Sequence, residues 1–141
     1  MISKAAGGFM VKLELQPASV QADAAAIGRR TLEKRFHGDL EAASTGEMLA
    51  VMTAVEGSMA YVALEKVTGS LAGRQGSFVL QHASQMIRGK PFQSIRVVPD
   101  SGAEELLGLE GEMHIEIRDG EHLYVFEYNF MEQSATTDIE T

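Results

Sequence analysis

The stretch EMHIEIRDGEHLYVFEY, residues 112–128, decides the fold class. Its centre, Asp119-Gly120, is typical of a two-residue β-hairpin turn, because that turn requires positive φ angles. Pairing outward from the turn sets Ile115 opposite Tyr124 and Met113 opposite Phe126. Successive side chains of a strand point to opposite faces, so one face of this hairpin is apolar and the other is mostly charged. The stretch therefore predicts an antiparallel hairpin with one buried face.

Turn signals that contain glycine recur at short intervals along the rest of the chain, with alternating or β-branched stretches between them. This spacing predicts an all-β meander. A turn at Arg88-Gly89 sets Leu80 opposite Val97 and His82 opposite Ile95. The other expected turns are Glu56-Gly57, Gly73-Arg74 and the three-residue loop His37-Gly38-Asp39; they pair Met52 with Tyr61, Ala50 with Ala63, Met48 with Glu65, Val67 with Leu80, Glu65 with His82, Phe36 with Leu40 and Lys34 with Ala42.

A first strand with Phe9, Val11, Leu13 and Leu15 on one face brings the expected number to about eight strands. Closing such a meander into a barrel removes its two unpaired edges. We therefore predict an all-β fold, a single antiparallel eight-stranded β-barrel of the up-and-down type, over residues 1–131. Residues 132–141 are polar and acidic without periodicity, and are predicted to form a flexible C-terminal tail.

Composition limits the classes of function. The net charge of −8 argues against nucleic-acid binding, which needs grouped Lys and Arg. The nearest basic cluster, Arg29-Arg30 with Lys34-Arg35, is short and interrupted by Glu33. Cysteine is absent, so disulfides, thiolate metal sites and cysteine nucleophiles are excluded. No apolar run approaches the roughly 20 residues of a membrane-spanning helix, and Met1 to Gly8 does not read as a secretory signal. We expect a soluble cytoplasmic protein without membrane partners.

One predicted ribbon is apolar on both faces. Its outer face would carry Leu49, Val51, Val62 and Leu64, as apolar as its inner face. Either the assignment of inner and outer faces is reversed there, or something covers the outside. A second copy of the chain is the simplest cover, so we expect a homodimer through these four residues.

A few polar side chains fall on the apolar inner face, led by Glu65 and His82. A buried charge normally pairs or becomes neutral, and Lys34 is placed to share the Glu65 carboxylate. One interpretation is a general acid/base pair, with Glu65 and His82 as the catalytic residues of a small-molecule pocket. The other is a buried ion pair that fixes the strand register. The residues proposed to contact a ligand are Lys34, Tyr61, Arg74, Gln81, Ser84, Gln93, Tyr124 and Tyr128.

Some of these residues are weaker candidates. Arg74 lies in a glycine-containing hairpin end that can cradle an anion, but turn chemistry is the simpler explanation of those glycines. Gln81 is expected to point away from the core. A metal site is not expected, because only His82 among the four histidines points inward, and no cofactor motif is present.

Several runs of sequence resemble domain-of-unknown-function family 3224. They are Phe36 to Glu41, Tyr61 to Glu65, Gly73 to His82, Val97 to Gly102 and Glu105 to Gly111, in the expected order. The run GRQGSFVLQH, residues 73–82, is the most specific. Two segments depart from the pattern: the loop after Pro99 is less glycine-rich, and Met86 to Arg88 is more apolar. The resemblance implies a small bacterial protein with a barrel similar to that of plant allene oxide cyclases, and implies no function.

Three functions are compatible with these features. The first is a β-barrel that binds an apolar or amphipathic small molecule, with the Glu65–His82 pair at its polar end. The second is a cofactor-independent cyclase, isomerase or lyase that uses this pair for proton transfer, an analogy at the level of fold. The third is a non-catalytic dimeric interaction module.

Overall fold

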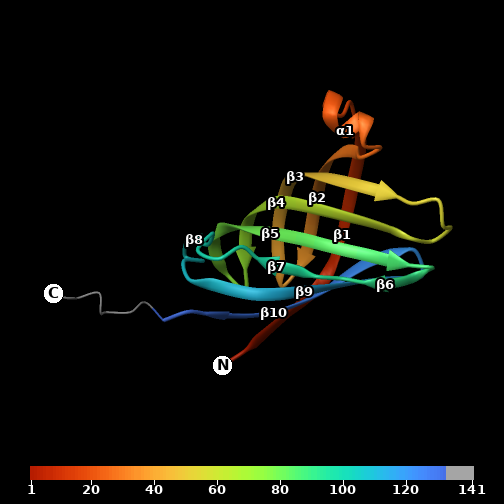
Figure 1. The fold of residues 1–141 in the computed structure, drawn as a ribbon. Coiled ribbons are helices and arrows are strands. Elements are labelled where there is room, and N and C mark those ends of the chain that lie inside the picture. Colours follow the sequence, from red (N-terminus) through yellow and green to blue (C-terminus); the bar gives the residue numbers. More distant parts are fainter. Residues whose placement is uncertain (133–141) are drawn as a thin grey trace.

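A computed structural model describes residues 1–132 and shows a closed antiparallel barrel (Figure 1). The elements are β1 (Ser3–Gln16), α1 (Val20–Ala24), β2 (Gly28–Gly38), β3 (Leu40–Met52), β4 (Met59–Leu71), β5 (Arg74–Ile87), β6 (Lys90–Phe92), β7 (Ile95–Val97), β8 (Ala103–Glu104), β9 (Leu109–Arg118) and β10 (Glu121–Phe130). Around the barrel the order is β1-β2-β3-β4-β5-β7-β9-β10, and β10 pairs back onto β1. The predicted all-β, eight-stranded barrel is confirmed. Most of the predicted C-terminal tail, residues 133–141, lies outside the described residues.

Two short strands are added to the eight. Strands β6 and β8 pair with β5 at opposite ends of that strand. The seam between β7 and β9 is short, with Arg96 opposite Glu112. Gln93 extends this seam, because its side-chain amide accepts from the Ile115 N–H at 3.0 Å and donates to the Ile115 carbonyl at 2.9 Å. A side chain thus replaces backbone pairing where the ladder ends.

Two of the predicted registers are confirmed. The Asp119-Gly120 turn sets Ile115 opposite Tyr124 and Met113 opposite Phe126. The Arg88-Gly89 turn sets Leu80 opposite Val97 and His82 opposite Ile95. At both turns the two central residues have positive φ, between 48° and 89°, as a type I′ turn requires.

Three of the predicted registers are wrong by two residues. Strands β4 and β5 turn at Ala72-Gly73 and not at Gly73-Arg74, so Glu65 faces Leu80, and His82 faces Ala63. The β3–β4 connection is a longer loop over residues 53–58, and it sets Met52 opposite Met59, Ala50 opposite Tyr61 and Met48 opposite Ala63. Because side chains alternate with a period of two, a shift of two residues keeps each side chain on its predicted face.

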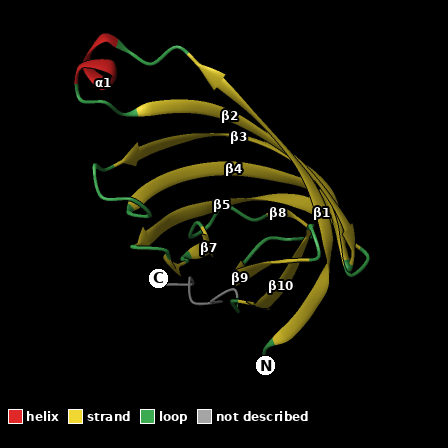
Figure 2. Ribbon diagram, turned by 90° about the vertical axis from the view of Figure 1, so that its right-hand side faces the viewer, coloured by secondary structure: helices red, strands yellow, loops and turns green. Residues whose placement is uncertain are grey.

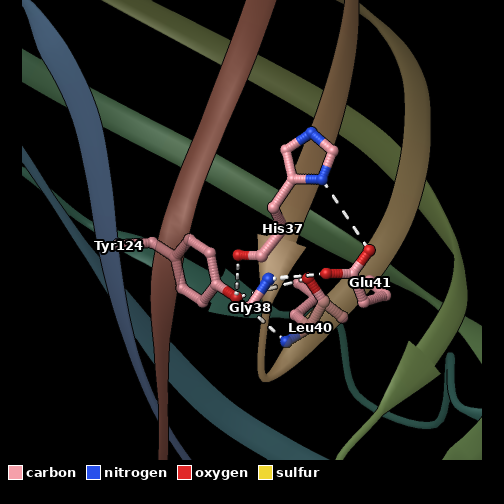
Figure 3. A network of polar contacts seen from close by, with 5 residues as sticks. All are labelled: His37, Gly38, Leu40, Glu41 and Tyr124. Carbon is pink, nitrogen blue, oxygen red and sulfur yellow. Dashed lines mark hydrogen bonds and ion pairs between the residues drawn. The ribbon is translucent and has the colours of Figure 1, made fainter.

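The third wrong register is that of β2 and β3, which pair Phe36 with Ala42 and Lys34 with Ser44. Figure 3 shows the corner between these two strands, with Tyr124 against His37, Gly38 and Leu40. The Tyr124 hydroxyl, from β10, tightens this corner. It accepts from the Leu40 N–H at 2.9 Å and faces the carbonyls of His37 and Leu40 at 3.0 and 3.3 Å. Burial raises the pKa of Tyr124, so the phenol keeps its hydrogen and donates it. Gly38 has a φ of +110°, and a Cβ there would lie 2.7 Å from the Ala6 carbonyl oxygen.

The two ends of the barrel differ. At the end that holds the β2–β3 and β4–β5 corners, large apolar side chains fill the interior. The side chains buried there are Phe36, Leu40, Leu71, Phe78, Leu106, Leu109 and Phe126. The opposite end carries α1, the β3–β4 loop and the β5–β6 turn (Figure 2). There the inner-facing Leu13 and Ile117 are 49% and 66% exposed, so the core does not extend to that end.

Within residues 1–132, no helix has the length and apolar character needed to cross a membrane.

Candidate functional site

The end of the barrel that carries α1, called the open end below, contains a cavity of about 390 Å³. Its walls are mainly apolar, with methionine and aromatic side chains from strands on every side. The lining residues are Phe9, Val11, Leu13, Leu32, Lys34, Met48, Met59, Tyr61, Ala63, His82, Ser84, Gln85, Met86, Pro91, Phe92, Gln93, Ile115, Ile117 and His122. Leu13, Phe92 and Ile117 are about half exposed or more, so the cavity reaches the surface. Its volume falls within the range of small-molecule sites.

A buried ion-pair network lies beside this cavity. The Glu65 side chain is fully buried, and its Oε2 lies 2.8 Å from Lys34 Nζ and 2.9 Å from His82 Nε2. Its Oε1 accepts a hydrogen bond from the Ser44 hydroxyl at 3.0 Å. The Lys34 ammonium also lies 5.0 Å from the centre of the Phe9 ring, a cation–π distance. Four strands thus meet at a single carboxylate.

The balance of forces on Glu65 keeps it ionised. Burial alone raises the pKa of this carboxyl, because it disfavours the charged form. The hydrogen bond from His82 and the charge of Lys34 act in the opposite direction and outweigh burial, so the pKa of Glu65 lies below its ordinary value. An ionised carboxylate accepts hydrogen bonds only, and His82 must therefore carry a hydrogen on Nε2.

Two buried polar atoms at the cavity have no hydrogen-bond partner among residues 1–132. They are Nδ1 of His82 and Oγ of Ser84. Both residues line the cavity and lie on the same face of β5, two positions apart. A buried polar atom without a partner is costly, and in native proteins such atoms call for an explanation. Here both unpartnered atoms belong to residues that line a mainly apolar cavity.

The structure brings together only part of the predicted site. Lys34, Tyr61, Ser84 and Gln93 line the cavity with His82, and Glu65 lies behind them against Lys34 and His82. The predicted direct opposition of Glu65 and His82 is wrong; they meet on the diagonal, across neighbouring strands.

Four predicted ligand contacts do not line the cavity. Tyr124 holds the β2–β3 corner, and Tyr128 packs in the core with its ring 5.3 Å from that of Phe126. The Arg74 guanidinium lies 4.3 Å from the Phe130 ring centre, near the end of the barrel that holds the β4–β5 corner. Gln81 is exposed on the outer face, as expected. None of the four is among the residues that line this cavity.

His122 is a lining residue that the sequence interpretation missed. It was expected next to a turn and not on the inner face, whereas it is the second residue of β10 and lines the cavity. The pairing of β1 with β10 sets it opposite Phe9, with ring centres 5.2 Å apart. That pairing closes the barrel between the two ends of the chain, and no local turn signal indicates it.

Two other features bear on function. No group of three or more potential metal ligands is found in the described part of the chain. The inner and outer faces of the β3–β4 ribbon were assigned correctly, and Leu49, Val62 and Leu64 are 43%, 53% and 56% exposed. The homodimer through this face stays a prediction.

The chain is similar to a known protein family and to a solved structure. The family model described as Protein of unknown function (DUF3224) matches residues 5–128. The crystal structure of a protein of unknown function from the DUF3224 family of Shewanella oneidensis MR-1 is similar, with a TM-score of 0.89 and 48% sequence identity. The match covers 94% of this chain and 100% of that chain. No curated protein matches the chain.

Proposed function

The chain belongs to the DUF3224 family of proteins of unknown function, and from the geometry of its barrel we propose that it binds a small amphipathic molecule. The apolar part of the ligand lies against the methionine and aromatic walls of the open end. Its polar part meets His82 and Ser84. The observation that carries this proposal is the pair of buried, unpartnered polar atoms, His82 Nδ1 and Ser84 Oγ, on two residues that line a mainly apolar cavity.

The walls support the proposal. Met48, Met59 and Met86 contribute three flexible, polarisable side chains to a single cavity, and methionine adapts readily to ligands of irregular shape. Leu13, Phe92 and Ile117 give the entrance exposed apolar surface that an apolar molecule can contact as it enters. A core that is filled by its own side chains needs neither flexible methionine walls nor an exposed apolar entrance.

Methionine methyl NMR tests this proposal without any substitution. The probe is 2-naphthol, a planar aromatic alcohol, titrated into protein labelled at the methyl groups of its eight methionines. We expect saturable one-to-one binding that shifts the signals of Met48, Met59 and Met86. The exposed Met10 and Met131 serve as internal controls and should stay unchanged. Absence of saturable binding, or shifts restricted to the exposed methionines, would contradict the proposal.

A matched pair of variants checks the location. Ala63→Leu adds bulk to the cavity wall, whereas Ala83→Leu adds the same bulk on the outer face of the neighbouring strand. Filling the cavity should weaken 2-naphthol binding at least tenfold, and the outer variant should bind as the wild type does. Urea unfolding of both variants verifies that each retains its fold.

Proton-transfer catalysis is the second candidate function. Glu65 holds His82 through Nε2, an arrangement that orients a histidine to act as a general base through Nδ1. For any substrate that the barrel converts, Glu65→Gln and His82→Ala should each reduce kcat. Unchanged turnover in both variants would remove these residues from a catalytic role.

A further inference from the structure

We infer that the cavity selects ligands that carry a hydroxyl group, and that this hydroxyl donates its hydrogen to Nδ1 of His82. The inference rests on the proposed binding function and specifies the chemical class of the ligand. It follows from the hydrogen-bonding capacity of three neighbouring groups, Glu65, His82 and Ser84.

The hydrogen of the His82 ring lies on Nε2. Its Nε2 lies 2.9 Å from Oε2 of Glu65, the same oxygen that lies 2.8 Å from Lys34 Nζ. Since an ionised carboxylate can only accept, Nε2 is the protonated nitrogen. In a neutral imidazole the other nitrogen, Nδ1, then has a free lone pair and acts as an acceptor.

The charges around His82 do not favour a second buried cation. The single negative charge of Glu65 is already balanced by Lys34, whose side chain is 7% exposed. A proton on Nδ1 would add a second buried positive charge with no second carboxylate in this network, and unpaired buried charge is unfavourable. The Tyr61 ring, with its centre 6.4 Å from that of the His82 ring, adds no carboxylate to this network. The charge balance therefore favours neutral His82 with Nδ1 as an acceptor.

Ser84 supplies a hydrogen-bond donor next to His82 on β5. Its hydroxyl is buried, unpartnered among residues 1–132, and free to donate one hydrogen bond. A ligand hydroxyl matches both protein groups, because it donates one hydrogen bond and accepts others. A methyl ether or a ketone offers no hydrogen to Nδ1. A carboxylate offers only lone pairs, and these repel the lone pair of Nδ1.

The cavity walls define the rest of the ligand. Phe9, Tyr61 and Phe92 present aromatic surface, and the only charged lining side chain within the described residues, Lys34, is already paired with Glu65. No unpaired cation is thus offered to an anionic group. The geometry points to neutral apolar alcohols and phenols.

Three naphthalene derivatives of matched shape test the inference: 2-naphthol, 2-methoxynaphthalene and 2-naphthoate. Their dissociation constants are measured by fluorescence at neutral pH, where the naphthol is un-ionised. A buried acceptor left unpaired weakens binding by roughly tenfold or more, so we expect 2-naphthol to bind at least that much more tightly than the methyl ether. The carboxylate should bind most weakly.

Substitutions then locate the preference. His82→Phe removes the acceptor but retains a ring, and it should abolish the preference for naphthol over its methyl ether. His122→Phe makes the same change at the other histidine of the cavity wall and should leave the preference intact. Ser84→Ala does not touch the Glu65 network and should reduce the preference severalfold, so the test does not depend on the folding of one variant.

The possible outcomes separate the two proposals. Equal affinity for naphthol and methyl ether, or tighter binding of the carboxylate, would overturn the hydroxyl inference while leaving a binding barrel in place. A preference that persists in His82→Phe would overturn the role of Nδ1. Failure of all three compounds to bind would contradict the proposed function itself, and the inference with it.

Discussion

Replacing Glu65 with glutamine should be one of the most destabilising single changes in this protein. The substitution keeps the shape of the side chain and removes one buried negative charge. Lys34 then remains with its ammonium in a site where the side chain is 7% exposed and the counter-charge at 2.8 Å is gone. Breaking a buried pair in this way costs about 3–5 kcal/mol.

This loss is large compared with the stability of a typical domain, about 5–15 kcal/mol. For a chain of this size it lowers the melting temperature by roughly 6–20 °C. Urea unfolding followed by circular dichroism measures the change. The double variant Lys34→Met, Glu65→Gln should recover part of the lost stability, because it leaves no charge without a partner.

The chain provides a matched control for this experiment. Glu47 makes the same kind of contact, with Oε2 at 2.8 Å from Arg29 Nη2, but its side chain is 55% exposed. Water screens such a pair, so Glu47→Gln should cost only a small fraction of the loss seen for Glu65→Gln. If both variants unfold at the same urea concentration, burial is not what makes the Glu65 network important, and the reasoning fails.

Three further predictions concern pH, the barrel corner and assembly. The pKa of Glu65 is lowered in the folded state, so its contribution to stability is present above the ordinary value of 4.5 and is lost as pH falls through the lower folded value; a stability–pH profile as flat in wild type as in Glu65→Gln would contradict this. Tyr124→Phe leaves the buried Leu40 N–H without its acceptor and should cost about 1–3 kcal/mol in urea unfolding, more than Tyr128→Phe does. Leu64→Glu places a charge on the exposed outer face and should convert a homodimer to a folded monomer in sedimentation experiments, whereas an unchanged dimer would place the interface elsewhere.

Local sequence signals predict the hairpins of this barrel where turn chemistry is unambiguous. Asp119-Gly120 and Arg88-Gly89 gave correct registers because glycine fits the second central position of a type I′ turn. The β4–β5 turn was misplaced because Ala72 occupies the first central position with a φ of +49°, which alanine rarely adopts. The predicted turn, Gly73-Arg74, places glycine at the first central position and therefore lies one residue too far along the chain.

The predicted contact between Glu65 and His82 is present despite these register errors, for a geometrical reason. A register error of two residues moves a side chain along the sheet but keeps it on the same face, so Glu65 and His82 remained neighbours inside the barrel. The cavity itself was beyond prediction from sequence. Whether Leu13 and Ile117 meet across the interior or stay apart depends on barrel curvature, which no local pattern encodes. The approach of His122 to Phe9 depends in the same way on closure between distant strands.

The pairing of β1 with β10 also determines when this chain can finish folding. Ser3 to Phe9 align with residues 122–128, so β1 completes its pairing only after β10 has emerged from the ribosome. The corner at Leu40 likewise waits for the Tyr124 hydroxyl, 84 residues later in the sequence. Until then the growing chain exposes an unpaired strand edge, which can associate with other chains. Closure is therefore expected only after β10 has emerged from the ribosome, and a nascent chain that stalls before β10 is expected to be prone to aggregation.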